Sequence, residues 1–276
     1  MKALKFNNVN VESLKRLVAQ MSVFDQSIYM TWGREHITAM SVTLRQDKIK
    51  RLRWNTADIL PSQMLETEGG KPLVINFVQS GKLKKILSQF SGNVDMEVAY
   101  AIREDDGALY ALSVTFSDCD VKLTEKTVDM NYQERMPTEE QMRGLIDGDN
   151  NVSVSLTADK IRRIKALGSI NKDNPAIEFS LCDGGLIVSE YDDIDKYCAN
   201  KKSIYDFIVS QTDVRGAFAV SFSKDLFDAL GGEQEVLFKI NGATEGEGGL
   251  SRAVLQSQGE SFSSDIIISA MVKDNI

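Results

Sequence analysis

The chain contains 276 residues, which is long for one compact domain and comfortable for two. It carries 40 acidic and 32 basic residues, and its net charge of −8 argues against a surface that binds nucleic acid everywhere, although a local basic site is not excluded. No run of about 18 consecutive apolar residues occurs and the N-terminus lacks an apolar signal core, so we expect neither a transmembrane helix nor a secretory leader.

Cysteine and histidine are too sparse to build most catalytic centres. The three cysteines, Cys119, Cys182 and Cys198, lack the CxxC spacing of metal and redox sites, which favours reduced thiols and a cytoplasmic location (the host cytoplasm for a viral protein). His36 is the only histidine, so a catalytic triad or a histidine-ligated metal has almost no material. We therefore predict no catalytic residue, no metal site and no cofactor, in a protein that is not an enzyme.

Alternating apolar and polar residues predict antiparallel strands separated by a few helices. Helices are expected at residues 11–22, 81–90, 157–167 and 223–232. Strands are expected at 27–32, 36–44, 48–54, 72–78, 94–102, 108–116 and 120–124 in the first half, and at 176–181, 185–191, 204–210, 217–222, 235–240, 252–258 and 265–272 in the second. Each half is therefore predicted to be α+β, with two short helices on one face of a mainly antiparallel sheet.

A polar segment separates the two halves. Between Thr124 and Asn150 the apolar periodicity weakens, acids outnumber bases and Pro137 interrupts the chain. These features are typical of an exposed connector, with one helical turn after Thr138. We therefore expect an N-terminal domain at residues 1–124, an interdomain connector at 125–150 and a C-terminal domain at 151–276.

The two halves also resemble each other. Residues 14–23 (LKRLVAQMSV) align without gaps on residues 161–170 (IRRIKALGSI), with apolar and basic positions matched. Residues 74–87 (VINFVQSGKLKKIL) and 218–230 (FAVSFSKDLFDAL) form a second pair in the same order. Two matches in a fixed order favour an internal duplication.

Positive charge is concentrated on the predicted helices. These four segments carry ten basic and four acidic residues in a chain of net charge −8, and the acidic segment 223–232 is the exception among them. Their apolar stripes are predicted to face the core, so most of the bases point to the opposite side. Nine bases are our candidate DNA-binding residues: Lys15, Arg16, Lys82, Lys84, Lys85, Lys160, Arg162, Arg163 and Lys165.

Two interpretations of these basic faces stay open. Amphipathic helices often carry lysine on a merely solvated face. Faces that are basic without mixed charges instead fit sequence-independent contact with duplex phosphates. Stacking on single-stranded DNA would need exposed aromatic residues, and the helices offer none. The charge pattern favours duplex DNA.

Duplicated helix–sheet units with basic helices and acidic strands resemble the DNA sliding clamps of the bacteriophage and proliferating-cell-nuclear-antigen type. The C-terminal half carries the resemblance most closely, in the order SVSLTADKIRRIKALGSI, AIEFSLCDGGLIVSEYD, AVSFSKDLFDAL and DIIISAMVKDNI. It extends over essentially the whole chain, although the first half matches by order of elements more than by residues. The resemblance implies duplicated clamp domains with sheets outside and two short helices per domain inside, closing as a homotrimeric ring around duplex DNA.

The resemblance also implies a function and partners. A clamp of this type is a processivity factor that tethers a replicative DNA polymerase, and an external ATP-driven clamp loader would open the ring, since the chain has no GxxxxGK[ST] P-loop. Partner proteins would dock beside the connector and the C-terminus, which suggests the following residues: Met40, Met130, Tyr132, Ala270, Met271 and Val272. For Met40, ordinary core packing is an equal alternative.

Three further alternatives remain. A viral polymerase accessory factor of the same fold could act as a monomer or dimer that holds DNA against one basic face. A metal-dependent nuclease could use the acidic residues of segment 190–195 (EYDDID), although a solvated acidic loop is the simpler interpretation. The basic residues between Arg45 and Arg53 fit a subunit interface, a charged edge strand or a second DNA contact.

Overall fold

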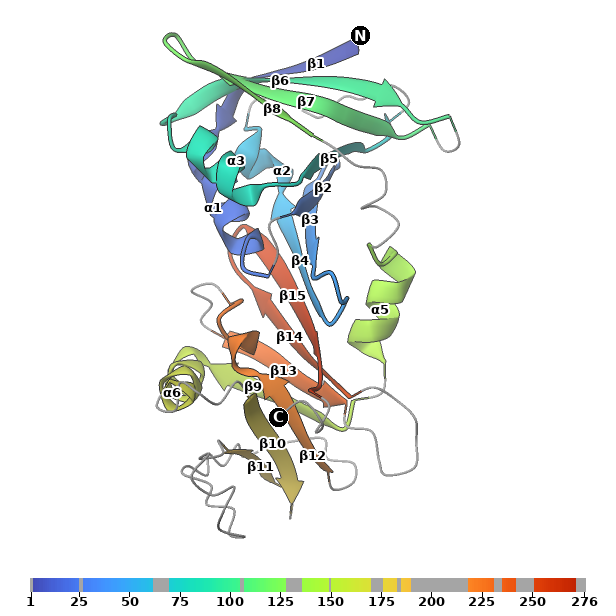
Figure 1. Ribbon diagram of the computed structural model, residues 1–276, viewed down its shortest axis with the longest axis vertical. Coiled ribbons are helices and arrows are strands. Elements are labelled where there is room, and N and C mark those ends of the chain that lie inside the picture. The colour runs from blue at the N-terminus through green and yellow to red at the C-terminus, as the bar shows by residue number, and fades with distance from the viewer. Residues whose placement is uncertain are drawn as a thin grey trace. The chain divides into compact units, whose positions relative to one another are not determined.

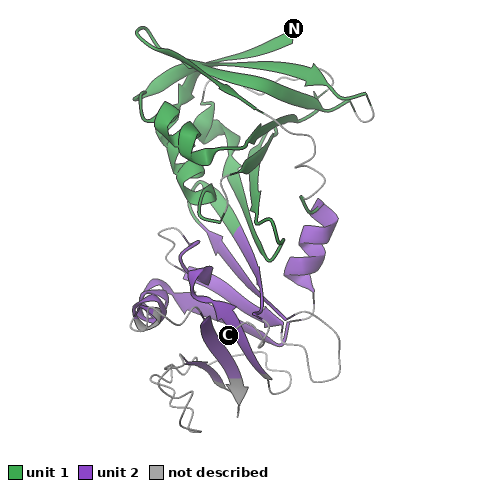
Figure 2. Cartoon of the chain, in the orientation of Figure 1, with its two compact units in different colours: residues 1–137, 259–264 green, residues 138–258, 265–276 purple. Residues whose placement is uncertain are grey.

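A computed structural model describes residues 2–24, 27–61, 70–104, 107–127, 136–148, 150–169, 176–182, 185–189, 218–230, 235–241 and 251–271 (Figure 1). The chain divides into two compact units: residues 1–137 with 259–264 form unit 1, and residues 138–258 with 265–276 form unit 2 (Figure 2). No helix within the described ranges is long and apolar enough to span a membrane.

Unit 1 is built on a single sheet. Its elements are β1 (Lys2–Asn10), α1 (Val11–Met21), β2 (Ile28–Trp32), β3 (His36–Val42), β4 (Lys48–Asn55), α2 (Thr56–Ile59), β5 (Leu73–Phe77), α3 (Ser80–Leu87), β6 (Asn93–Ile102), β7 (Leu109–Ser117) and β8 (Lys122–Lys126). The strand order is β1-β6-β7-β5-β2-β3-β4, and β8 pairs with β7. β5 and β7 run parallel, whereas the pairs β1·β6, β6·β7, β2·β3, β2·β5 and β3·β4 are antiparallel.

The helices of unit 1 pack together, with α1 against both α2 and α3 (Figure 1). α1 begins where the side chain of Asn10 accepts a hydrogen bond from the Ser13 amide (3.1 Å), which satisfies one of the unpaired N–H groups of the first turn. Leu14 and Leu17 lie in its buried stripe. Because this stripe faces the core, Arg16 on the other side of the helix is exposed.

A segment from near the end of the chain completes unit 1. The carbonyl oxygen of Ser261 accepts a hydrogen bond from the Asn55 amide (2.9 Å). Phe262 stacks on Trp54, with ring centroids 5.3 Å apart and ring planes 11° from parallel. Residues 259–264 thereby cover the end of β4 with apolar surface that residues 1–137 do not supply.

Unit 2 contains two groups of strands. Its elements are α5 (Glu139–Asp147), β9 (Val152–Thr157), α6 (Ala158–Gly168), β10 (Ala176–Cys182), β11 (Gly185–Ser189), β12 (Phe218–Ser223), the 3₁₀ helix η3 (Lys224–Leu226), β13 (Glu235–Asn241), β14 (Arg252–Gln258) and β15 (Phe262–Ser269), whose first three residues belong to unit 1. The strands follow the orders β15-β14-β13-β9 and β11-β10-β12. Phe179 on β10 packs against Phe222, Phe227 and Phe238 with ring centroids 5.1 to 6.3 Å away, so aromatic contacts join the second group to η3 and β13.

The same strand pairings recur in both units in the same chain order. In unit 1, β6 pairs with β1 and β7; in unit 2, β13 pairs with β9 and β14. Likewise β2 pairs with β3 and β5, as β10 pairs with β11 and β12. α1 follows β1 as α6 follows β9, so the matched stretches 14–23 and 161–170 occupy equivalent helices. The predicted duplication and the α+β class are confirmed.

The sequence prediction lacks three elements: β1, β9 and α2. β9 carries a readable signal, because Val152, Val154 and Leu156 alternate and are buried. β1 is polar apart from a few positions, so its pairing with β6 and not its own pattern makes it a strand. The strand predicted at 204–210 lies outside the described residues.

The fourth predicted helix is shorter and tighter than expected. It is the single 3₁₀ turn η3, followed by a further turn in which the Asp228 amide donates to the Asp225 carbonyl (3.0 Å). Leu226, Phe227 and Leu230 are all buried. Their i, i+1, i+4 spacing also fits the stripe of an α-helix, so the apolar pattern of the sequence does not distinguish a 3₁₀ turn from a longer α-helix.

The connector contains a longer helix than expected. The hydroxyl of Thr138 accepts from the Gln141 amide (3.2 Å) and the Gln141 side chain accepts from the Thr138 amide (2.8 Å), so a capping box starts α5. Met142 is buried beneath the helix. At the other end, Arg252 Nε donates to the carbonyl oxygen of Leu145 (2.9 Å), which attaches α5 to β14 within unit 2.

Replacing Thr138 by alanine should loosen α5. The substitution removes one half of the capping box and should lower the local stability of the helix by about 1 kcal/mol. Hydrogen exchange of the α5 amides measures this directly. Arg143→Ala is the matched control, because Arg143 is exposed in the same helix and its replacement should change stability by less than about 0.5 kcal/mol. Equal protection of α5 in wild type and Thr138→Ala would contradict the assignment of the cap.

Candidate nucleic-acid interface

Unit 1 brings five of the nine candidate DNA-binding residues onto two helices in contact. Lys15 and Arg16 lie on α1, and Lys82, Lys84 and Lys85 lie on α3, which packs against α1. Three of them form what we call the open cations of unit 1: Arg16, Lys84 and Lys85. Their side chains are exposed, and no hydrogen bond or ion pair joins these side chains to any other residue that the structure describes.

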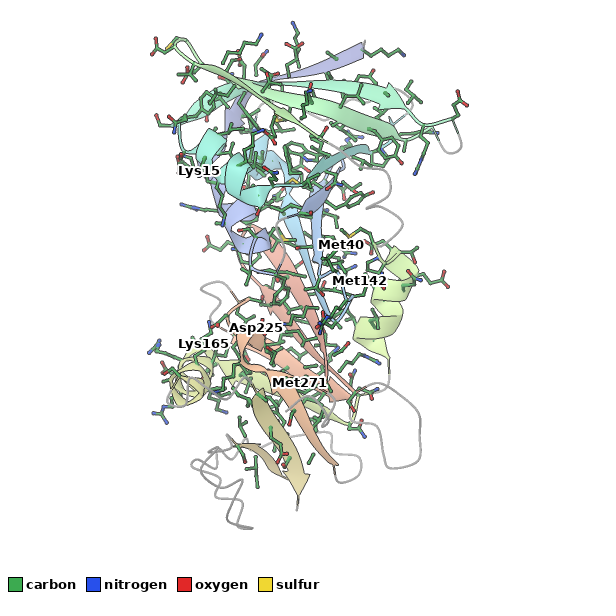
Figure 3. All side chains as sticks on the ribbon, viewed as in Figure 1. Lys15, Met40, Met142, Lys165, Asp225 and Met271 are labelled. Carbon is green, nitrogen blue, oxygen red and sulfur yellow. The ribbon has the colours of Figure 1, made fainter. Side chains whose placement is uncertain are left out.

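Lys15 has a structural role within the same helix pair. Its ammonium group lies 2.7 Å from Glu12 Oε1 and donates to the carbonyl oxygen of Phe90 at 2.8 Å. Phe90 follows the C-terminus of α3, where backbone carbonyls are left without helical partners and a cation is favoured. Lys15, labelled on α1 in Figure 3, therefore links α1 to the end of α3.

Lys82 is held by a carboxylate from the sheet. Its Nζ lies 2.6 Å from Glu125 Oε2 on β8. The Lys82 side chain is half exposed, whereas Glu125 is only 6% exposed, so the lysine supplies the positive charge that a buried carboxylate needs. This ion pair fastens the start of α3 to β8.

The remaining four candidates lie together on α6 in unit 2. Arg163 is exposed and Lys160 is half-buried, and neither side chain pairs with another described residue. Arg162 Nη1 lies 3.0 Å from Asp159 Oδ1, and both side chains are about three-quarters exposed. Lys165 is labelled on α6 in Figure 3. Its Nζ lies 3.9 Å from Oδ1 of Asp228, in the turn that follows η3.

The candidate partner-binding residues fall into three groups. Met40 on β3 is 7% exposed, which favours its alternative interpretation as core packing. Ala270 and Met271 are half-buried after β15, and their amides donate to the carbonyl oxygens of Ser251 and Ser221, both at 2.8 Å. Three residues lie outside the described part of the chain: Met130, Tyr132 and Val272.

The basic segment around β4 is divided between the interior and the surface, since Arg53 is exposed and Lys48 is half-buried. Lys50 is fully buried and Arg51 is 6% exposed, and both interact with other parts of the protein. A charged edge strand would expose such residues, and so would a DNA contact. Arg45, in the turn between β3 and β4, is exposed.

Residues considered for catalysis offer no assembled centre among those described. His36 is exposed at the start of β3. No group of three or more His, Cys, Asp and Glu side chains is placed to hold a metal within the described ranges. The acidic segment 190–195 lies outside them.

Of the four carboxylates that pair with bases on the helices, two can be recognised from their spacing in the sequence and two cannot. Glu12 with Lys15 and Asp159 with Arg162 are spaced three residues apart, which is a recognisable helix pair. Glu125 and Asp228 come instead from distant parts of the chain. Their partners emerge only when the sheet and the helices are assembled.

Comparison with known proteins identifies the architecture. No protein-family model and no curated protein matches the sequence. Proliferating Cellular Nuclear Antigen (PCNA) from Entamoeba histolytica matches with a TM-score of 0.61 at 12% identity, over 99% of this chain and 100% of that chain. The chain has the DNA sliding-clamp fold.

Two further structures support this assignment of the fold. A. fulgidus PCNA, solved with the C-terminal region of FEN-1 bound, gives a TM-score of 0.63 at 12% identity over 99% of both chains. The PCNA2–PCNA3 complex from Sulfolobus tokodaii gives 0.59 at 9% identity, over 97% of this chain and 99% of that chain. The expected resemblance is thus confirmed for the PCNA fold, and the bacteriophage type stays a prediction.

Removing the positive charge of Lys82 should destabilise unit 1. In Lys82→Gln the carboxylate of Glu125 would stay buried without its cation, at a cost on the order of 1 to 2 kcal/mol because the lysine itself is half exposed. Denaturant unfolding measures this cost, and the double variant Lys82→Gln/Glu125→Gln should recover most of the stability. Lys85→Gln, on the same helix and exposed, should leave stability unchanged. Equal stability of all variants would show that the ion pair does not support the fold.

Proposed function

We propose that the protein is a sliding clamp that closes as a homotrimeric ring around duplex DNA and tethers a replicative DNA polymerase. One observation carries the proposal: the sliding-clamp fold extends over 99% of the chain, and its helices in both units present exposed bases such as Arg16, Lys85 and Arg163. The fold alone would also fit a scaffold protein that does not bind DNA, so the exposed bases are what favour a clamp on DNA.

The proposed mechanism is topological, and the chain itself performs no chemistry. A closed ring keeps a bound polymerase close to the primer terminus, so each dissociation is followed by rebinding at high effective concentration. Contacts between lysine or arginine and phosphates depend little on sequence, which allows the ring to slide. An external ATP-driven loader would open and close the ring, because the chain has no P-loop of its own.

Partner proteins and subunits are proposed by analogy with the similar structures. One of these shows the C-terminal region of FEN-1 bound to PCNA, and another is a complex of two PCNA chains. For this chain we propose docking of polymerase and other replication proteins beside the connector and the chain end, through Met130, Tyr132, Ala270, Met271 and Val272. Met40 is buried in unit 1 and offers little contact area to a partner.

Native mass spectrometry should detect a species of three chains. The expected mass is three times the 30.7 kDa of the single chain, and its share should rise with protein concentration. Light scattering over the same concentrations provides an independent check. A strict monomer at every concentration would contradict ring closure and favour the accessory factor that holds DNA against one face.

Retention on circular DNA should distinguish encirclement from binding to one face. After loading by a compatible clamp loader and ATP, a ring should stay on nicked circular DNA at high salt and dissociate when the circle is cut, because it slides off the free ends. Gel filtration of the DNA-bound fraction before and after cutting measures this. A monomeric or dimeric accessory factor should instead be retained equally on cut and uncut DNA.

A further inference from the structure

The two units differ in how their helix cations are compensated. In unit 1, Lys15 and Lys82 pair with Glu12 and Glu125. Arg16, Lys84 and Lys85 have no carboxylate partner among the described residues. In unit 2, two of the four bases on α6 do have one: Arg162 with Asp159 and Lys165 with Asp228. Among the described residues, three exposed bases are thus left without a carboxylate partner on the helices of unit 1, and one, Arg163, is left on α6.

The carboxylate near Lys165 belongs to the element that is equivalent to α3. Where α3 carries three lysines and no acid, η3 and its following turn carry Asp225 and Asp228 with one base, Lys224. Oδ1 of Asp228 lies 3.9 Å from Nζ of Lys165. A phosphate in contact with this Nζ would therefore also lie within a few ångströms of the Asp228 carboxylate. This separation is well below the screening length of roughly 8 to 10 Å at ordinary salt, so repulsion by Asp228 would oppose the contact.

Compensated bases contribute less to DNA binding for a second reason. Affinity for phosphates comes mainly from counterions that DNA releases when an uncompensated cation approaches. The exposed ion pair is itself weak, but its carboxylate stays within a few ångströms of a phosphate that contacts the base, and this negative charge lowers the net attraction. On α6 only Arg163 is both exposed and without a carboxylate partner among the described residues.

From these contacts we infer that the duplex is held mainly by unit 1, through Arg16, Lys84 and Lys85, and that Asp228 weakens the contact made by α6. The inference rests on the proposed function and assigns unequal roles to its two basic faces. Unit 1 binds the DNA phosphates more strongly, and unit 2 binds them more weakly.

Two double variants of the full-length protein test this division. Lys84→Gln/Lys85→Gln removes two charges from unit 1, and Arg162→Gln/Lys165→Gln removes two from unit 2. Fluorescence anisotropy with a labelled linear duplex of about 30 base pairs, repeated over a salt series, gives the affinity and its salt slope. The unit 1 variant should bind on the order of tenfold more weakly at low salt, and its salt slope should be shallower by about 0.9 for each phosphate that is no longer neutralised. The unit 2 variant should bind less than about threefold more weakly.

Asp228→Asn tests the carboxylate separately. It should tighten duplex binding about twofold to fivefold at low salt, and the gain should vanish when Lys165→Gln is added. Asp95→Asn is the matched control, since it removes the same charge from an exposed position on β6 and should not change affinity. Circular dichroism of each variant verifies that it is folded.

Each outcome decides the matter. Equal decreases in affinity from the two double variants, or no gain from Asp228→Asn, would overturn the unequal roles and leave the clamp proposal standing. Wild-type protein that is not retained on nicked circular DNA after loading, or whose affinity no charge variant changes, would overturn the clamp proposal together with this inference. A large decrease confined to the unit 1 variant, with a gain from Asp228→Asn, supports it.

Discussion

Burial of one side of each helix is the constraint on which the candidate interface depends. Leu14 and Leu17 on α1, and Ile161 and Ile164 on α6, are buried at positions that the duplication makes equivalent. A helix that buries this stripe must turn its remaining side chains toward solvent. The direction of the arginines and lysines therefore follows from hydrophobic packing, and a change in the packed stripe would redirect the charge as well.

Carboxylates then divide the cations into those that build the protein and those that stay available. Lys15 links two helices and Lys82 neutralises a buried carboxylate on β8, so both contribute to the stability of unit 1. Lys84 and Lys85 are close to Lys82 in sequence yet have no such partner among the described residues. Neighbouring lysines on one short helix thus have different functions, which composition alone does not reveal.

The architecture was largely predictable because its signals are local, whereas the electrostatics of the site were not. Alternation located most strands, and helical spacing placed α1 and α6 within about one residue of their observed bounds. β1 was not predicted because its partner β6 lies far along the chain. η3 was predicted as a longer α-helix because its apolar pattern is helical, whereas tertiary burial makes it a 3₁₀ turn. The partners of Lys82 and Lys165 escaped for the same reason, since only the assembled fold brings Glu125 and Asp228 to them.

The stacking of Phe262 on Trp54 has a consequence for the order in which the protein matures. Unit 1 receives its last apolar cover from residues that the ribosome adds after nearly all of unit 2. A nascent chain that ends near residue 137 would leave the Trp54 ring without that cover. Unit 1, although its first 137 residues are made first, thus reaches its final form only after nearly all of unit 2 has been synthesised.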